Sequence, residues 1–314
     1  MLRLIISRLA ALAPLLLIVS LATFLLSALL PEEPAAIVAG DNTDPANLAR
    51  ISARLGTDRP LIVRYGDWLA GAVTGDLGTS YFSSVPVGPQ LAERAGTTLS
   101  IAAGGLVLAT LFGTTAGILA AVLRGGAVDR AVTLLTSTAM AAPPFWVGLL
   151  LVSFFAIRLG WFPPAGYVPP AGGLGAWLGS IALPSVALAL APGAYLARQT
   201  RGSMVGVLER EYVRTAIARG YRPGRVILRH AVRNGLSPVV TLLGFQVTIL
   251  IGGSLVVEKV FALPGLGSLA IEAVLRQDIP VVQGLVVTIA TAVVLVNLLL
   301  DLVYGYLNPK VRLS

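Results

Sequence analysis

The residue types that could carry chemistry are few in this sequence. It contains one histidine, His230, and no cysteine, which excludes a disulfide, a thiolate metal site, a cysteine nucleophile and a multi-histidine metal site. A single histidine also makes a serine–histidine–acid triad implausible, and no GxxxxGK[ST] phosphate-binding loop occurs. The sequence therefore predicts no catalytic site, metal or cofactor in this chain. If ATP drives its function, another chain must bind the ATP and Mg²⁺.

Acidic residues inside apolar stretches are what an ion-coupled secondary transporter would need to bind protons or ions. Asp301 is the clear case, about two turns before Asn308. Because no second acid or histidine accompanies it, we expect its carboxylate to pair with a neighbouring arginine or a backbone donor. An ion-coupled transporter stays open as an alternative function, opposed by this shortage of charge.

Composition indicates that these residues belong to a membrane protein. Hydrophobic residues make up 56%, charged residues 12%, and the mean hydropathy is +0.84, whereas about a quarter of a soluble domain is charged. A spanning helix needs about 20 mostly apolar residues. Six stretches meet this need, over residues 9–30, 98–123, 131–157, 180–197, 237–257 and 283–307. The sequence thus predicts an all-α polytopic protein in which residues 1–314 form a single transmembrane domain.

The placement of lysine and arginine predicts the orientation of the chain. With the N-terminus inside, fifteen of the 23 basic residues fall in inside segments, nine of them between Arg198 and Arg233. The short outside loops carry only Arg158, Lys259 and Arg276. Both termini are therefore expected in the cytoplasm. Residues 31–97 then form the first extracytoplasmic loop, with short helices against the membrane face.

The cytoplasmic segment 198–236 has a helix–glycine–helix pattern. Apolar residues recur at steps of three and four from Met204 to Ile217, which predicts an amphipathic helix. Gly220 suits the left-handed position that ends a helix, and Pro223 suits the first turn of the next. That second helix carries a basic stripe made of Arg222, Arg225, Arg229 and Arg233.

Two partners suit this segment. Anionic lipid headgroups would neutralise the basic stripe. The apolar face of the first helix must be buried somewhere, and a groove on a cytoplasmic protein is a suitable place. A membrane scaffold that recruits such a partner is a further alternative function.

Polar groups on the fifth predicted span are candidates for the pathway. Thr241, Gln246 and Thr248 interrupt an apolar helix, and hydrogen bonds to neighbouring helices explain them as well as pathway lining does. Glu258 and Lys259 lie at the expected outer end of this span. They could contact an extracytoplasmic binding protein or form an outer gate.

Five segments resemble the permease subunits of dipeptide, oligopeptide and nickel ABC importers. They are GTDRPLIVRYGDWLAGAVTGDLGTSY (56–81), PPFWVGLLLVSFFAIRLGWFPPAGY (143–167), EYVRTAIARGYRPGRVILRHAVRNGLSPVV (211–240), VVEKVFALPGLGSLAIEAVLRQDIPVVQG (256–284) and VNLLLDLVYGYLNPKVR (296–312). Because the likeness extends over almost the whole chain, it is more specific than any one motif.

The resemblance implies a type I ABC importer permease fold with six transmembrane helices in the bacterial inner membrane. It further implies a homologous second permease, two ATPase subunits or domains and an extracytoplasmic solute-binding protein. The cytoplasmic loop would be the coupling helix that inserts into a cleft on an ATPase. Its residues would be Tyr212, Val213, Arg214, Thr215, Ala216, Ala218 and Gly220.

This chain departs from the general permease pattern of EAA, three residues and then Gly. Arg214, Thr215 and Ala216 stand before Gly220, so the glutamate and the first alanine are missing. A role that depends on that glutamate does not carry over, whereas docking does. The sequence leaves open whether the solute is a dipeptide, an oligopeptide, a nickel chelate or another small solute.

Overall fold

The computed structural model describes residues 2–29, 34–42 and 44–307. In these ranges the secondary structure is helical, apart from an isolated bridge between Thr79 and Pro86, so the all-α class is confirmed there. Contacts divide the chain into two compact units. Unit 1 comprises residues 1–97 and 264–295, and unit 2 comprises residues 98–263 and 296–314.

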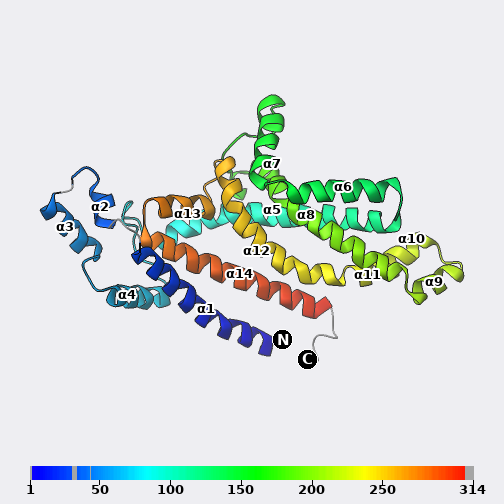
Figure 1. The fold of residues 1–314 in the computed structure, drawn as a ribbon, viewed down its shortest axis with the longest axis horizontal. Helices are drawn as coiled ribbons and strands as arrows, with labels where there is room; N and C mark the ends of the chain where they lie inside the picture. Colours follow the sequence, from blue (N-terminus) through cyan, green and yellow to red (C-terminus); the bar gives the residue numbers. More distant parts are fainter. Residues whose placement is uncertain (1, 30–33, 43, 308–314) are drawn as a thin grey trace. The chain divides into compact units, whose positions relative to one another are not determined.

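The helices follow one another along the chain, with the longer connections at residues 75–86 and 159–169 (Figure 1). Those up to the start of the basic segment are α1 (Leu2–Ala28), α2 (Pro34–Ala39), α3 (Pro45–Leu55), α4 (Leu61–Thr74), α5 (Val87–Val122), α6 (Ala127–Ala141), α7 (Pro144–Leu151), the π-helical η1 (Val152–Arg158), the 3₁₀ turn η2 (Pro170–Gly172) and α8 (Leu174–Leu208). The remaining ones are α9 (Glu211–Ala218), α10 (Pro223–Val226), the π-helical η3 (Ile227–Ala231), α11 (Val232–Gly235), α12 (Ser237–Val260), α13 (Leu266–Leu275) and α14 (Ile279–Leu307).

Four described helices are long and apolar enough to cross a membrane: α5, α8, the Leu242–Val260 part of α12 and the Ile279–Leu299 part of α14. A fifth span results if α6 and the α7–η1 helix are counted together. The apolar part described for α1, Ala10–Leu26, is shorter than these. The described residues therefore support four to five of the six predicted spans.

The third predicted span is not one straight helix. Residues 127–141 and 144–158 are bent by 104°. The bend lies at Pro143 and Pro144, and Ala142 before them is extended, with ψ 122°. A proline disfavours helical geometry in the residue before it and lacks the N–H of the helical ladder, which explains the break. The stretch predicted as the fourth span keeps Pro184 and Pro192 inside the continuous helix α8.

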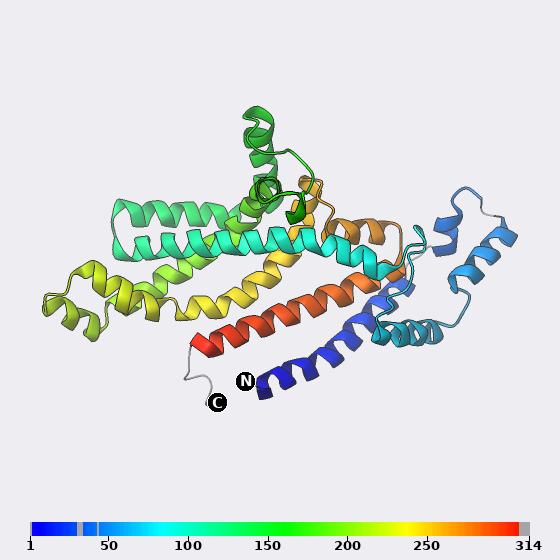
Figure 2. The same cartoon turned by 180° about the vertical axis from the view of Figure 1, so that it is seen from behind.

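Unit 2 is organised around α8, which contacts α6, α7 and α12 (Figures 1 and 2). Sixteen residues of α8 are buried, so this helix forms the centre of the unit. Helix α5 packs closely against α8 because glycines of α5 leave room for the α8 backbone. A Cβ added at Gly113 would lie 2.5 Å from the Gly193 carbonyl oxygen, and one at Gly117 would lie 2.5 Å from that of Ala197.

Unit 1 joins the first turns of α5 to α13 and to the start of α14. Its core holds Val87, Leu266 and Leu285. Asp278 is 5% exposed. Its carboxylate accepts hydrogen bonds from the Ser80 hydroxyl (2.5 Å) and the Tyr81 amide (3.1 Å), so it fixes the loop before α5 to the start of α14.

The aromatic residues of the first loop also pack within unit 1. Burial raises the pKa of the Tyr81 phenol, although the Arg64 guanidinium opposes this shift. Tyr65 stacks on Trp68, and its hydroxyl lies 3.0 Å from that of Ser20 on α1. The short helix predicted here is therefore present as α4, and its aromatic pair is half-buried against α1.

Candidate coupling and gating sites

The predicted amphipathic run from Met204 to Ile217 is two helices, not one. Helix α8 ends at Leu208, and α9 begins at Glu211 after Arg210, whose ψ of 147° is extended. Met204 and Val207 are buried in a core cluster with Ala121 and Ala231. The first half of the apolar stripe is thus covered by the chain itself, which periodicity alone could not reveal.

Helix α9 exposes most of its predicted docking residues. Tyr212, Arg214, Thr215, Ala218 and Gly220 are exposed, Ala216 is half-buried, and Val213 is buried. The Tyr212 hydroxyl accepts a hydrogen bond of 3.0 Å from Asn234 on α11. Val213 and Tyr212 therefore hold α9 to its own chain, while the other exposed positions are available to a partner.

Gly220 ends α9 in the left-handed conformation, with φ +82°. The Gly220 amide donates to the Ile217 carbonyl (2.9 Å), and the Tyr221 amide donates to the Ala216 carbonyl (3.3 Å). These two bonds form the Schellman motif. An added Cβ would meet nothing within 4 Å. The positive φ, and not steric crowding, therefore favours glycine at this position.

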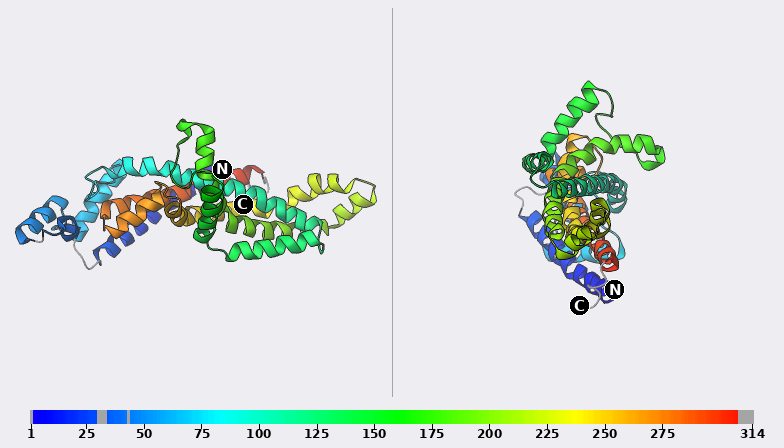
Figure 3. Two further views of the ribbon diagram at one scale, coloured as in Figure 1. Left: turned by 90° about the horizontal axis from the view of Figure 1, so that it is seen from above. Right: turned by 90° about the vertical axis from the view of Figure 1, so that its right-hand side faces the viewer.

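The second helix of the segment begins at Pro223, as predicted, and is divided among α10, η3 and α11. Figure 3 (left) shows this α9–α11 hairpin extending beyond the turn that joins α5 and α6. Its basic stripe is exposed throughout, at Arg222, Arg225, Arg229 and Arg233. Ala231, on the opposite side, is buried against α8 and α5.

Ion pairs fix the end of α8, which leads into this hairpin, to the α5–α6 turn and the start of α6. The Asp129 carboxylate accepts two bonds from Arg201, at 2.6 and 2.8 Å, and one of 2.9 Å from the Gly125 amide. Arg124 pairs with Glu209 at 2.5 Å. These partners are 72 and 85 residues apart in the sequence, and sequence analysis missed them because no local pattern relates them.

The polar groups of α12 do not share one face. Gln246 is 1% exposed, and its side-chain oxygen has no hydrogen-bond partner in the described part of the chain. Thr248 is exposed. The side chains of Thr241 and Asp301 lie outside the described residues. Gln246 and Thr248 thus differ in burial, and pathway lining and hydrogen bonding to a neighbouring helix both stay open for them.

Glu258 and Lys259 also point to different sides of α12. Lys259 is exposed, whereas Glu258 is fully buried. The Glu258 carboxylate accepts a hydrogen bond of 2.7 Å from the Thr98 hydroxyl on α5. An acid in such a place needs hydrogen bonds to offset its desolvation. The contact joins the last turn of α12 to α5, eleven residues after the start of α5 at Val87.

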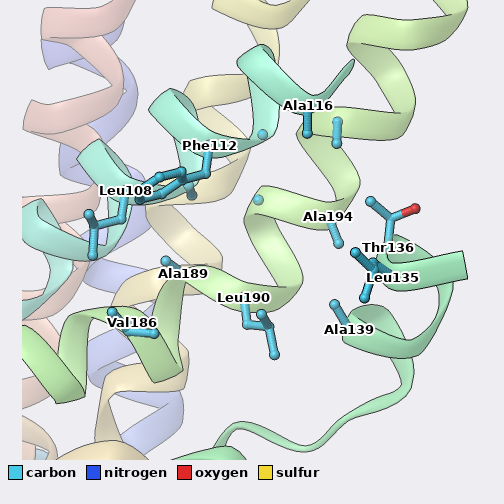
Figure 4. Close-up of a pocket in the computed structure, with 14 residues that line it drawn as sticks. Leu108, Phe112, Ala116, Leu135, Thr136, Ala139, Val186, Ala189, Leu190 and Ala194 are labelled. Atoms are coloured by element: carbon cyan, nitrogen blue, oxygen red, sulfur yellow. The ribbon is translucent and has the colours of Figure 1, made fainter. Parts of the chain in front are cut away.

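An apolar groove of about 400 Å³ lies between α5, α6 and α8. Figure 4 shows Phe112, Leu135 and Leu190 around it. Among its lining residues, Thr136 supplies the side-chain hydroxyl and the others are apolar or glycine. A peptide site needs placed polar groups, so this groove is suited to lipid or to another apolar helix.

Two family models match the chain. "Binding-protein-dependent transport system inner membrane component" covers residues 113–313, and the N-terminal membrane component of the same systems covers residues 1–102. Among curated proteins, one named a peptide transport system permease protein of Brucella abortus is 42% identical over 98% of both chains. The glutathione transport system permease protein of Escherichia coli strain K12 is 39% identical over 99% of both.

A solved structure has a related fold. An inward-facing conformation of the MetNI methionine ABC transporter matches with a TM-score of 0.58 at 16% identity. The match covers 70% of this chain and 96% of the other. At that identity the likeness concerns the fold alone, which is that of an ABC importer permease.

Proposed function

Because the chain belongs to the family of binding-protein-dependent transport system inner membrane components, we propose that it forms half of the translocation pathway of an ATP-driven importer for peptides or similar small solutes. Members of this family are permease subunits, not enzymes. They work with an ATPase, which binds ATP and Mg²⁺, and with a solute-binding protein. The identity of 42% to a peptide-system permease over 98% of both chains carries the peptide part of the proposal.

We propose six spans with both termini in the cytoplasm. Helix α1 would be the first span, followed by α5, the bent α6–α7 pair, α8, α12 and α14. Residues 31–97 would be the first extracytoplasmic loop and residues 198–236 the cytoplasmic coupling loop of a single transmembrane domain. The nine arginines between Arg198 and Arg233 support this orientation.

We propose that α9 is the coupling helix that docks into the ATPase. Its exposed side chains include the small Thr215 and Ala218 and the apolar Ile217, on a projecting hairpin. A homologous second permease would complete the pathway, and anionic lipid would lie against the exposed arginine stripe. For the outer gate we propose the buried Glu258–Thr98 contact, because a fully buried carboxylate cannot itself meet a binding protein in this conformation.

Uptake by a reconstituted complex tests the function. The complex should contain this chain, the second permease, the ATPases and the binding protein, in vesicles preloaded with ATP. We expect peptide or glutathione uptake that requires both ATP and the binding protein. Uptake that follows an imposed proton or sodium gradient without ATP would instead establish an ion-coupled transporter. ATPase recruitment without uptake of any offered solute would indicate a scaffold.

The solute class needs its own measurement. Binding of dipeptides, longer peptides, glutathione and nickel chelates to the partner binding protein, measured by calorimetry, ranks them directly. We expect a peptide or glutathione to bind most tightly. Preference for a nickel chelate would contradict the peptide assignment and leave the importer assignment intact.

A further inference from the structure

The turn between α5 and α6 is held to the end of α8 by two ion pairs. Arg201 presents its Nε and Nη2 atoms to the two oxygens of Asp129, at 2.6 and 2.8 Å. Eight residues further along, Glu209 pairs with Arg124 at 2.5 Å. These two separate links, one from the start of α6 and one from the turn before it, resist sliding and rotation of this region against the end of α8.

The Asp129 pair is the stronger of the two links. The Asp129 side chain is 7% exposed and that of Arg201 is 34% exposed, whereas Arg124 and Glu209 are each 56% exposed. A two-pronged arginine–carboxylate pair is also directional. The same carboxylate accepts the amide of Gly125, whose φ is +79°. Asp129 therefore fixes the shape of the turn as well as its attachment to α8.

These pairs lie where motion of α9 would reach the long helices of unit 2. Arg201 is part of α8, and Glu209 directly follows the last residue of that helix, two positions before α9 begins. Toward the other end of α5, eleven residues after its start at Val87, the Thr98 hydroxyl donates to the buried Glu258. About 36 Å of continuous helix connects Thr98 to Val122, at 1.5 Å per residue. Helix α5 thus joins the clamped turn to the proposed outer gate.

We propose that the Asp129–Arg201 and Arg124–Glu209 pairs form a clamp that transmits the ATP-driven displacement of α9 through α8 to α5, and so to the Thr98–Glu258 contact. This proposal rests on the proposed function, since it assumes that α9 docks into an ATPase. Asp129 and Arg201 are positioning residues in this scheme. They touch neither the solute nor the ATP.

The test is the amount of solute taken up per ATP hydrolysed in the reconstituted complex. Asp129→Asn and Arg201→Gln should each lower this ratio about fivefold or more, the low end of typical allosteric coupling factors. The double variant should be no worse than the more severe single one, because both changes remove the same link. Arg130→Gln, which changes the exposed neighbour of Asp129, serves as the matched control and should leave the ratio unchanged.

A merely structural pair would behave differently. Loss of assembled complex lowers uptake and ATP hydrolysis in proportion, so an unchanged ratio in the Asp129 and Arg201 variants would overturn the clamp. Additive effects in the double variant would also overturn it. The wild-type complex separates this outcome from failure of the proposed function. If the wild-type complex shows no ATP-dependent uptake, the proposed function is wrong. If the wild type shows such uptake and the variants keep its ratio of uptake to ATP hydrolysis, only the clamp is contradicted.

Discussion

Gly220 shows how one residue sets the end of the element that we expect to dock. Its positive φ allows the Gly220 and Tyr221 amides to reach the last carbonyls of α9. Without that closure, an eight-residue helix has little to hold its final turn, because short helices are marginal in water. The glycine therefore ends α9 and orders its last turn, which belongs to the segment proposed to bind the ATPase.

Replacing Gly220 with alanine should loosen α9. A residue with a Cβ in the left-handed region costs about 1–2 kcal/mol, which corresponds to an increase of roughly five- to thirtyfold in local opening. Hydrogen exchange of the α9 amides, followed by mass spectrometry, measures this opening. Gly224→Ala in α10 is the matched control, since an added Cβ there meets nothing within 4 Å and the φ is not positive. Equal exchange in the two variants would contradict the cap.

Glu258 should contribute to stability through its bond to Thr98. Glu258→Ala removes the acceptor of that 2.7 Å bond, and we expect a loss of about 1–3 kcal/mol. Glu258→Gln retains a carbonyl oxygen at this position and should cost less. Thermal unfolding of the purified protein in detergent compares the two.

Thr248→Ala, at an exposed position of the same helix, is the control for Glu258. It should change stability by less than about 0.5 kcal/mol. If Glu258→Ala also changed stability by less than this amount, the Glu258–Thr98 contact would not stabilise the protein. That result would contradict its assignment as the outer gate.

At the scale of elements, local patterns predicted some features well and others not at all. Hydropathy found α5, α8, α12 and α14, and turn chemistry found Gly220 and Pro223, because each signal lies within a few neighbouring residues. The bend at Pro143 could have been predicted from its two prolines. The division between α8 and α9 could not, since neither proline nor glycine stands at the break, which lies at Glu209 and Arg210. The Asp129–Arg201 and Arg124–Glu209 ion pairs could not be predicted either, because only the fold brings their partners together.

Close packing of α5 on α8 makes Gly117 sensitive to substitution. A Cβ there would lie 2.5 Å from the Ala197 carbonyl oxygen and 2.6 Å from the Thr200 Cβ. Backbone atoms cannot move aside as a flexible side chain can, so Gly117→Val should separate the helices at a cost of about 1–3 kcal/mol. Thermal unfolding in detergent measures the loss.

Gly202→Ala on α8 is the matched control for Gly117, because an added Cβ there meets nothing within 4 Å. A helical glycine replaced by alanine without a clash should stabilise the helix by up to about 1 kcal/mol. A stabilising Gly117→Val would show that the two helices do not approach as closely as the structure indicates.

At the scale of the whole molecule, the chain is one component of a larger machine. It carries no catalytic chemistry of its own, and its family works with an ATPase and a binding protein. In the proposed scheme it transmits motion from the α9–α11 hairpin to the proposed membrane-spanning helices. Unit 2 contains both ends of that route, from the exposed face of α9 to the buried Glu258.

The contact between α9 and the ATPase is the most direct test of this account. The chain contains no cysteine, so single cysteines can be placed at Thr215 and Ala218, with Leu275→Cys on α13, which is 78% exposed, as the control. A bifunctional cross-linker applied to the assembled, transport-active complex should join both α9 positions to the ATPase and leave Leu275→Cys unjoined to it. An active complex in which neither α9 position cross-links to the ATPase would contradict the assignment of α9 as the coupling helix.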